Sequence, residues 1–326
     1  MSPIPWKVRL SACVLALVAG GSLAGASEMR RAPIVIDPIT IRPPPVLEPS
    51  HQEPGPDVPG VVPIIDDDVT GLRFPSGLTI HGGTKRRAIL FTFDDGPSNR
   101  TTPQLLDLLD DLGIKALFFV TSESFGNGNP YERRHTKIVR EIVRRGHLVG
   151  SHTETHRQLP LLGNDEIQAE LAITERKLHR AVGRAPRLIR PPGGALSKRV
   201  ERVLGELGYT SVMWAVYAGD LEAKTPDDVV RTFFRVLDRR ERETGDRGGI
   251  VLMHDTKRHS LDALPRLVRA LQKRNCSLLE RGEELYDIVD DLGYFIPGHE
   301  PDQTLEERQE HLARDTVRAC HTIALR

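Results

Sequence analysis

From about Lys85 onward, short apolar runs alternate with longer stretches in which apolar residues recur at helical spacing. The apolar runs predict strands at residues 88–93, 116–121, 147–150, 187–190, 211–216 and 249–253. The amphipathic stretches predict helices at residues 102–112, 131–145, 165–182, 198–207, 226–242 and 261–273. Because strands and helices alternate, the pattern favours an α/β domain with a parallel sheet, either a barrel or a doubly wound sheet.

The N-terminus has a different pattern, typical of a secretory signal. Lys7 and Arg9 precede an apolar stretch over residues 10–19, and small residues follow as far as Ala26. This order predicts a signal peptide over residues 1–26, cleaved near Ala26, and therefore an exported protein, periplasmic or secreted. A short uncleaved anchor is the alternative, although the apolar stretch is short for a membrane span.

Proline separates the signal from the α/β pattern. Ten of the 24 prolines lie between Pro33 and Pro63, where apolar periodicity is weak. We therefore expect a proline-rich leader over residues 27–84, a folded domain over 85–296 and a helix-prone C-terminal appendage over 297–326.

Composition narrows the class of protein further. The 326 residues include 45 Lys and Arg against 45 Asp and Glu, so the basic excess of a nucleic-acid or membrane-surface binder is missing. Three cysteines are too few for a disulfide scaffold. For Cys276 and Cys320 we expect two unpaired buried thiols, with pairing in an oxidising compartment as the alternative. We expect no nucleic-acid partner and no stable protein partner.

Polar residues suited to catalysis gather at the ends of the predicted strands, where β/α folds place their active sites. The first strand ends in Asp94 and Asp95, and adjacent carboxylates on an extended chain point in different directions. One can bind a metal while the other acts as a base, since two carboxylates sharing one site would repel each other. An acidic turn is the structural alternative.

Two histidines and an arginine follow at later strand ends. His152 and His156 are spaced to reach one metal ion if their segment forms a helical turn. Together with one carboxylate they suit a metal hydrolase and equally a non-haem iron oxygenase. Arg190 precedes a Pro-Pro-Gly-Gly turn, and His254 follows a buried apolar run, where it is placed to donate a proton near neutral pH.

In this order the segments resemble the polysaccharide deacetylase family with a NodB-homology domain, carbohydrate esterase family 4. The resemblance covers about residues 85–296 and rests on TFDDGP, HTETH, RPPGG, the 217–221 segment YAGDL, and LMH. It implies a distorted (β/α)7-type barrel and a hydrolase that removes N-acetyl groups from polysaccharides.

The resemblance also implies a role for each matching residue. Asp94 corresponds to the catalytic base, His254 to the catalytic acid, Arg190 to the residue that orients the base, and Asp220 to the residue that supports His254. The implied ligands of one divalent metal ion, Zn²⁺ first and Co²⁺ or another ion next, are Asp95, His152 and His156.

Two departures from the family pattern concern the substrate pocket. Gly193 stands where the family has an aromatic residue, so the backbone N–H that helps bind the oxyanion is kept and the side-chain wall is lost. Leu221 replaces the tryptophan that lines the acetyl pocket, and Leu252 matches the leucine of that pocket. The shape of the pocket and the preferred sugar are the properties that these departures affect.

The expected substrate is an extracytoplasmic polysaccharide containing N-acetylglucosamine, with release of acetate. Peptidoglycan is the first choice, and chitin oligomers or biofilm glycans come next. The alternatives are an O-acetyl esterase or small-amide hydrolase on the same site, and a catalytically silent glycan-binding relative. The altered fourth motif supports the silent relative, whereas the intact acids, histidines and arginine of the other motifs oppose it.

Overall fold

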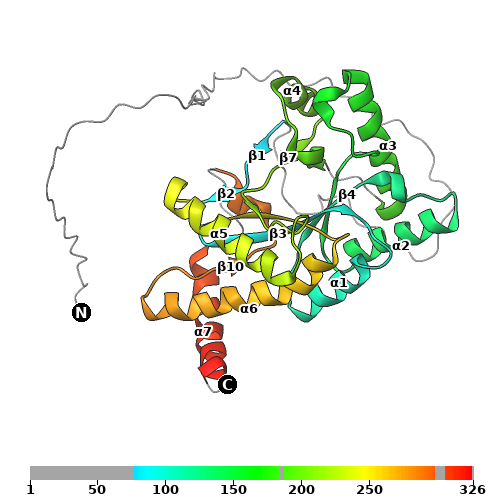
Figure 1. Ribbon diagram of the computed structural model, residues 1–326. Helices are drawn as coiled ribbons and strands as arrows, with labels where there is room; N and C mark the ends of the chain where they lie inside the picture. Colours follow the sequence, from blue (N-terminus) through cyan, green and yellow to red (C-terminus); the bar gives the residue numbers. More distant parts are fainter. Residues whose placement is uncertain (1–76, 184–186, 298–304, 325–326) are drawn as a thin grey trace, which may run out of the picture. The chain divides into compact units, whose positions relative to one another are not determined.

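The computed structural model describes residues 77–183, 187–297 and 305–324 (Figure 1). The predicted signal peptide and most of the predicted leader lie outside these ranges. Of the helices within them, none combines the length and the apolar character needed to cross a membrane.

Strands and helices alternate along the described chain as the sequence pattern predicts. The strands are β1 (Thr79–Ile80), β2 (Gly83–Thr84), β3 (Ala88–Gly96), β4 (Leu117–Val120), β5 (Leu148–Ser151), β6 (Leu188–Ile189), β7 (Thr210–Val212), β8 (Val216–Tyr217), β9 (Gly248–His254) and β10 (Asp287–Ile288). The helices are α1 (Thr102–Asp111), α2 (Pro130–Arg144), α3 (Asn164–Val182), α4 (Lys198–Glu206), α5 (Pro226–Thr244), α6 (Arg258–Glu280) and α7 (Leu305–Ala324). Short 3₁₀ turns are η1 (Ser122–Ser124), η2 (Leu159–Leu161), η3 (Pro192–Gly194) and η4 (Leu292–Phe295).

Local sequence signals set where several helices begin and end. Asn129 caps α2 by accepting from the Glu132 N–H at 3.0 Å, and proline follows it at the first helical position. Thr225 caps α5 in the same way, again followed by proline. Helices α3 and α5 end at Gly183 and Gly245, whose φ angles of 81° and 72° suit glycine best.

The strands form one curled sheet in the order β1-β7-β6-β5-β4-β3-β9-β2. The pairs from β7 to β9 along this order are parallel, and β2 runs antiparallel to β9. Strand β8 pairs with β9, and because β7 and β8 are consecutive in the chain, this pairing joins the two sides of the sheet into an irregular barrel. The expected distorted (β/α)7-type barrel is thereby confirmed over the doubly wound alternative.

Two details of the strands differ from the expectation. The predicted strand at 211–216 is divided into β7 and β8, because residues 213–215 leave the β6–β7 ladder and cross to β9. The sheet also begins at Thr79, ahead of the expected domain start at residue 85, because β1 pairs with β7 and β2 with β9.

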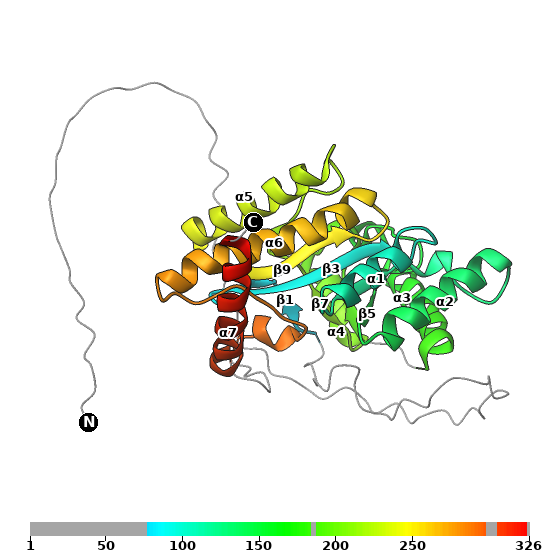
Figure 2. The same ribbon diagram turned by 90° about the horizontal axis from the view of Figure 1, so that it is seen from below.

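Strand alternation separates an inner core from an outer core. Ala88 and Leu90 of β3 pack inside the barrel, together with Leu117, Phe119 and Ile250 of neighbouring strands. The intervening residues of β3 pack against the helices on the outside, where α5 and α6 lie side by side (Figures 1 and 2). Side chains that continue the inner face beyond the last apolar layer therefore gather at the carboxyl ends of the strands.

The expectation of two unpaired thiols is wrong. Cys276 on α6 and Cys320 on α7 form a disulfide, with their Cα atoms 5.9 Å apart. The appendage helix reaches this position because Arg308 pairs with Asp287 and Gln309 exchanges two hydrogen bonds with the backbone of Leu285. Sequence spacing carries no sign of this docking, which depends on tertiary contacts.

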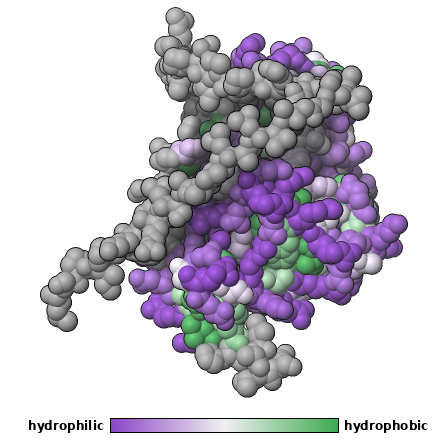
Figure 3. All heavy atoms as spheres, turned by 60° about the vertical axis from the view of Figure 1, so that its left-hand side comes forward, coloured by the Kyte–Doolittle hydropathy of each residue, from purple (hydrophilic) through white to green (hydrophobic). Residues whose placement is uncertain are grey.

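The described surface is mainly hydrophilic on the side of the domain drawn in Figure 3, with apolar residues in small separate areas. The exposed large hydrophobic residues of the described chain are likewise scattered: Tyr131, Leu161, Leu221 and Val317. Isolated apolar residues of this kind are normal on a protein surface. Leu221 differs from the other three because it lines the pocket described next.

Candidate active site

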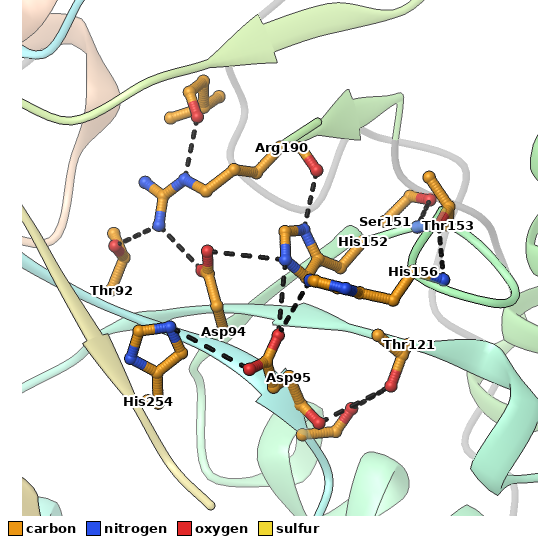
Figure 4. A network of polar contacts seen from close by, with 12 residues as sticks. Thr92, Asp94, Asp95, Thr121, Ser151, His152, Thr153, His156, Arg190 and His254 are labelled. Carbon is orange, nitrogen blue, oxygen red and sulfur yellow. Dashed lines mark hydrogen bonds and ion pairs between the residues drawn. The ribbon is translucent and has the colours of Figure 1, made fainter. Parts of the chain in front are cut away.

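Asp94 and Asp95 end β3 and reach different partners. Alternation along β3 places Asp94 on the inner face of the barrel with Thr92 and Leu90. Asp95 has a φ of 70°, and the pairing of β3 with β4 shifts register directly after Asp94. This irregularity directs the Asp95 carboxylate toward the loop after β5, as Figure 4 shows.

The loop after β5 carries His152 and His156. The histidines come together without a helical turn, because this segment is a loop in which Thr153 and His156 have φ angles of 68° and 59°. The Thr153 hydroxyl accepts a hydrogen bond from the His156 N–H at 3.1 Å, which closes the loop on itself. The two imidazole rings consequently lie with their centroids 4.8 Å apart.

Asp95, His152 and His156 have the geometry of a metal site within the described ranges, with one ligand atom of each inside 4.8 Å of the others. The Nε2 atoms of His152 and His156 lie 3.5 and 3.2 Å from Asp95 Oδ1, which is buried without a hydrogen-bond donor. His152 Nδ1 lies 2.7 Å from the Arg190 carbonyl, so its Nε2 is left to face Asp95. Two imidazole nitrogens next to a carboxylate oxygen that has no hydrogen-bond donor form a ligand set that suits a divalent transition-metal ion.

The electrostatics of the three groups agree with a role as ligands. Burial raises the pKa of the Asp95 carboxyl, but the adjacent His152 and His156 outweigh burial and hold that pKa well below its usual range. The contact with Asp95 raises the pKa of His156 in turn. A carboxylate that stays ionised is the form that a cation binds.

Arg190 is fully buried inside the barrel and fixes Asp94. Its Nη1 donates to Asp94 Oδ1 at 2.8 Å and to Thr92 Oγ1 at 2.6 Å, while its Nε donates to the Val212 carbonyl at 2.9 Å. The guanidinium also stacks on the Phe119 ring, 4.3 Å from its centroid. Since a buried guanidinium is costly without a counter-charge, the Asp94 carboxylate is the acidic partner that Arg190 requires inside the barrel.

His254 ends β9 directly beside Asp94 in the parallel register of the two strands. Its Nδ1 lies 3.1 Å from Asp220 Oδ1, and its backbone N–H donates to Asp220 Oδ2 at 2.7 Å. The Ser260 hydroxyl donates to the same carboxylate. Burial lowers the pKa of His254, but Asp220, Asp95 and Asp94 outweigh burial and raise it.

Eight of the ten predicted site residues line one pocket of about 270 Å³. They are Asp94, Asp95, His152, His156, Gly193, Leu221, Leu252 and His254. The other two, Arg190 and Asp220, are buried behind it and bond to Asp94 and His254. The structure therefore brings all ten predicted residues together.

The pocket has an aromatic wall that the sequence reasoning missed. Trp214 lines the pocket, and a Cβ at Gly194, whose φ is 65°, would lie 2.5 Å from the Trp214 ring. Gly193, with a φ of 64°, occupies a conformation that suits glycine better than an aromatic residue. The signal that could have found the wall is the position of Trp214, just ahead of the 217–221 segment.

Two buried carboxylates behind the site were also missed. Glu170 on α3 accepts from the Glu154 and Thr155 N–H groups at 2.9 and 2.8 Å and from the Thr155 hydroxyl at 2.5 Å. It therefore holds the loop between the two histidines. Its signal is a charged residue within the buried stripe of α3, between Ile167 and Leu171.

The second is Asp255, directly after His254. Its carboxylate is buried against Gly96, where a Cβ would lie 2.1 Å from Asp255 Oδ2, and it accepts from the Thr102 hydroxyl at 2.5 Å. Burial raises the pKa of Asp255 to about 7. Asp255 thus ties the end of β9 to the turn that follows Asp95.

Known proteins are similar to this chain in sequence and in fold. The family model for polysaccharide deacetylases matches residues 81–212. A peptidoglycan-N-acetylglucosamine deacetylase of Bacillus cereus is 28% identical over 197 residues, covering 59% of this chain and 66% of that protein. A chitin deacetylase of Arthroderma benhamiae is 33% identical over 218 residues, covering 65% of this chain and 56% of that protein.

A solved structure gives the same result for the fold. The chitin deacetylase of the fungus Colletotrichum lindemuthianum superposes with a TM-score of 0.56 at 26% identity, covering 71% of this chain and 96% of that one. The segment over residues 81–212 is therefore similar to polysaccharide deacetylases. It spans less than two thirds of the length of the two curated relatives, and the family-model match contains Asp94 to Gly193 but ends before Asp220 and His254.

Proposed function

We propose that this protein is an exported, metal-dependent N-deacetylase that removes acetyl groups from N-acetylglucosamine units of a polysaccharide, peptidoglycan first. One observation carries the proposal above all others: a metal-ligand triad, a carboxylate fixed by a buried arginine and a histidine backed by a buried carboxylate meet in one pocket. The relatives named for peptidoglycan and chitin deacetylation support the same reaction class.

Asp95, His152 and His156 are the residues that would hold the metal, with Zn²⁺ as the first choice. A divalent ion held by these residues would polarise an amide carbonyl and make a water molecule more acidic. The buried, unsatisfied Asp95 Oδ1 between two imidazole nitrogens supports this assignment.

Asp94 acts as the general base. The carboxylate lies outside the ligand triad, 3.7 Å from His152 Nε2, and Arg190 fixes its other oxygen. In this position it accepts the proton of the attacking water while Arg190 keeps it oriented. The backbone N–H of Gly193, on the pocket wall, is assigned to the developing oxyanion.

His254 acts as the general acid and protonates the departing sugar amine. Asp220 bonds to Nδ1, so the proton to be donated is on Nε2, which faces the pocket 3.9 Å from Asp95 Oδ2. The products are acetate and a glucosamine unit. Apolar side chains of Leu221, Leu252 and Trp214 line the pocket and are suited to the acetyl methyl group.

Export is part of the proposal. The predicted signal over residues 1–26 supports it, and so does the disulfide between Cys276 and Cys320, because such bonds persist in oxidising compartments. The substrates accessible there include peptidoglycan, chitin oligomers and biofilm glycans.

Acetate release from peptidoglycan, chitooligosaccharides and acetylated xylan, each with and without chelator, tests the proposal. Chelator-sensitive release from an N-acetylated glycan is the expected result. Release from acetylated xylan alone would establish an O-acetyl esterase instead. Binding to the glycans without release from any of them would favour a silent relative.

A further inference from the structure

A second cleft, of about 570 Å³, lies beside the catalytic pocket. Tyr217 and Glu222 line both hollows, so the two share a wall. The Tyr217 hydroxyl donates to Glu222 at 2.5 Å, which fixes this wall. A polymer with one unit in the catalytic pocket can therefore extend into the second cleft, hereafter the α5 cleft.

One face of α5 forms the far side of the α5 cleft. Its lining residues Asp228, Thr232, Arg235 and Arg239 recur at helical spacing, and the segment from 228 to 239 is about 16 Å long at 1.5 Å per residue. The opposite side is the loop after β8, where Gly219 has a φ of 73° and a Cβ would lie 2.8 Å from the Thr232 methyl. The close approach at Gly219 holds the loop against the helix.

In the α5 cleft the acidic side chains have close partners, whereas the basic side chains lack close carboxylates in the described part of the chain. Neither Lys224 nor Arg235 has a carboxylate within ion-pair distance among the described residues, and the ion pair of Arg239 with Glu243 is long, at 4.0 Å. The acids of the cleft are already engaged, since Asp228 accepts from Thr225 and pairs with Arg231, and Glu222 accepts from Tyr217.

Three neighbouring basic residues that do not line the cleft are paired with carboxylates. Arg240 on the same helix pairs with Asp246 at 2.7 Å, and Arg266 and Arg274 on α6 pair with Asp227 and Asp238 of α5. Lys224 and Arg235, which have no such carboxylate partner within the described ranges, both line the α5 cleft beside the catalytic pocket. A site that leaves cations unpaired next to a substrate pocket attracts anionic substituents.

We propose that Lys224, Arg235 and Arg239 bind carboxylates carried by the sugar units or attached peptides adjacent to the acetamide that is hydrolysed. This inference rests on the proposed deacetylase function and defines the substrate class: an acidic N-acetylated glycan such as peptidoglycan with its peptide carboxylates, rather than neutral chitin. The cations act on binding of the polymer and take no part in the chemical step.

The test compares one peptidoglycan fragment with the same fragment after its carboxylates have been converted to amides. For the wild-type protein, kcat/KM should be higher for the acidic form, and added salt should narrow the difference. In K224A/R235A, kcat/KM for the acidic fragment should fall about tenfold at most, mainly through KM, as expected for the loss of two exposed ion pairs. Its kcat/KM for the amidated fragment should stay unchanged.

Arg242→Ala is the matched control, because Arg242 is an exposed arginine of α5 that does not line the cleft. Equal rates of the wild type on both fragments, or an equal loss in the double variant on both, would overturn the inference while leaving the deacetylase function intact. Absence of acetate release from either fragment and from chitooligosaccharide would instead overturn the proposed function itself.

Discussion

Strained backbone conformations occur at two residues of the metal triad and at a residue between its two histidines. Among the described residues, those other than glycine with positive φ are Asp95, Thr153 and His156. Such conformations cost roughly 1–3 kcal/mol each and persist where the surroundings impose them. Glycine would relieve the strain at Asp95 or His156 but would remove a ligand, so the side chain and the strained backbone are both needed there.

The first prediction at this scale is that Asp94 acts as the base and Asp95 as a metal ligand. Asp94→Asn should abolish acetate release and leave the bound metal content unchanged, because Asp94 lies outside the triad. Asp95→Asn should lower metal content as well as activity. Metal analysis of both purified variants checks this, with circular dichroism as the control for folding. Loss of metal in D94N but not in D95N would reverse the two assignments.

His254 provides a prediction on pH. Asp220 raises the pKa of His254 against the effect of burial, so the acid stays protonated to a higher pH. Asp220→Asn removes the negative charge beside His254, so the pKa of His254 should fall. The alkaline limb of the kcat/KM profile should therefore move to lower pH. Asp238→Asn, which removes a carboxylate paired with Arg274 outside the site, should leave the profile in place. An unmoved limb in D220N would argue against His254 as the acid.

At the scale of elements, the site is assembled by strand ends and stabilised by helices. β3 and β9 bring Asp94 and His254 into register, whereas α3 contributes through Glu170 to the loop of His152 and His156. The strands position the chemistry because alternation sends every second side chain to the barrel interior. The helices stabilise the connecting loops that carry metal-ligating side chains.

Glu170→Gln tests this supporting role. The amide group of glutamine would face donors at Glu154 and Thr155, so the loop should lose its fixed geometry. Affinity for Zn²⁺, measured by calorimetry, should fall about tenfold, as is usual when a group behind a metal ligand is lost. Glu175→Gln on the same helix, which disrupts an ion pair with Arg187, is the control and should bind Zn²⁺ normally. Unchanged affinity in E170Q would exclude the role.

At the scale of the whole molecule, the regular patterns of the sequence predict secondary structure, whereas contacts between distant segments depend on packing and were missed. Alternation of apolar runs and amphipathic stretches predicts the strands, the helices and a parallel α/β domain, and strand-end position predicts the acids, histidines and arginine of the site. The barrel and the roles of Asp220, Gly193, Leu221 and Leu252 were predicted from the resemblance to polysaccharide deacetylases. The loop conformation that joins His152 and His156 was not predicted, because the positive φ angles of Thr153 and His156 have no sequence signature. Trp214 and Glu170 were missed because their roles depend on tertiary neighbours.

The disulfide is the long-range feature with the largest expected effect on stability. Cys276 and Cys320 are separated by 44 residues, and closing a loop of that length contributes up to about 4 kcal/mol through the entropy of the unfolded chain. C276S/C320S should therefore lower the free energy of unfolding by about 2–4 kcal/mol in denaturant titrations, and dithiothreitol should have a similar effect on the wild-type protein but none on the variant. Because α7 docks against α6 and β10, far along the chain from the strand-end ligands, acetate release at low temperature should be retained. A variant with unchanged stability would show that the Arg308 and Gln309 contacts alone hold α7 in place.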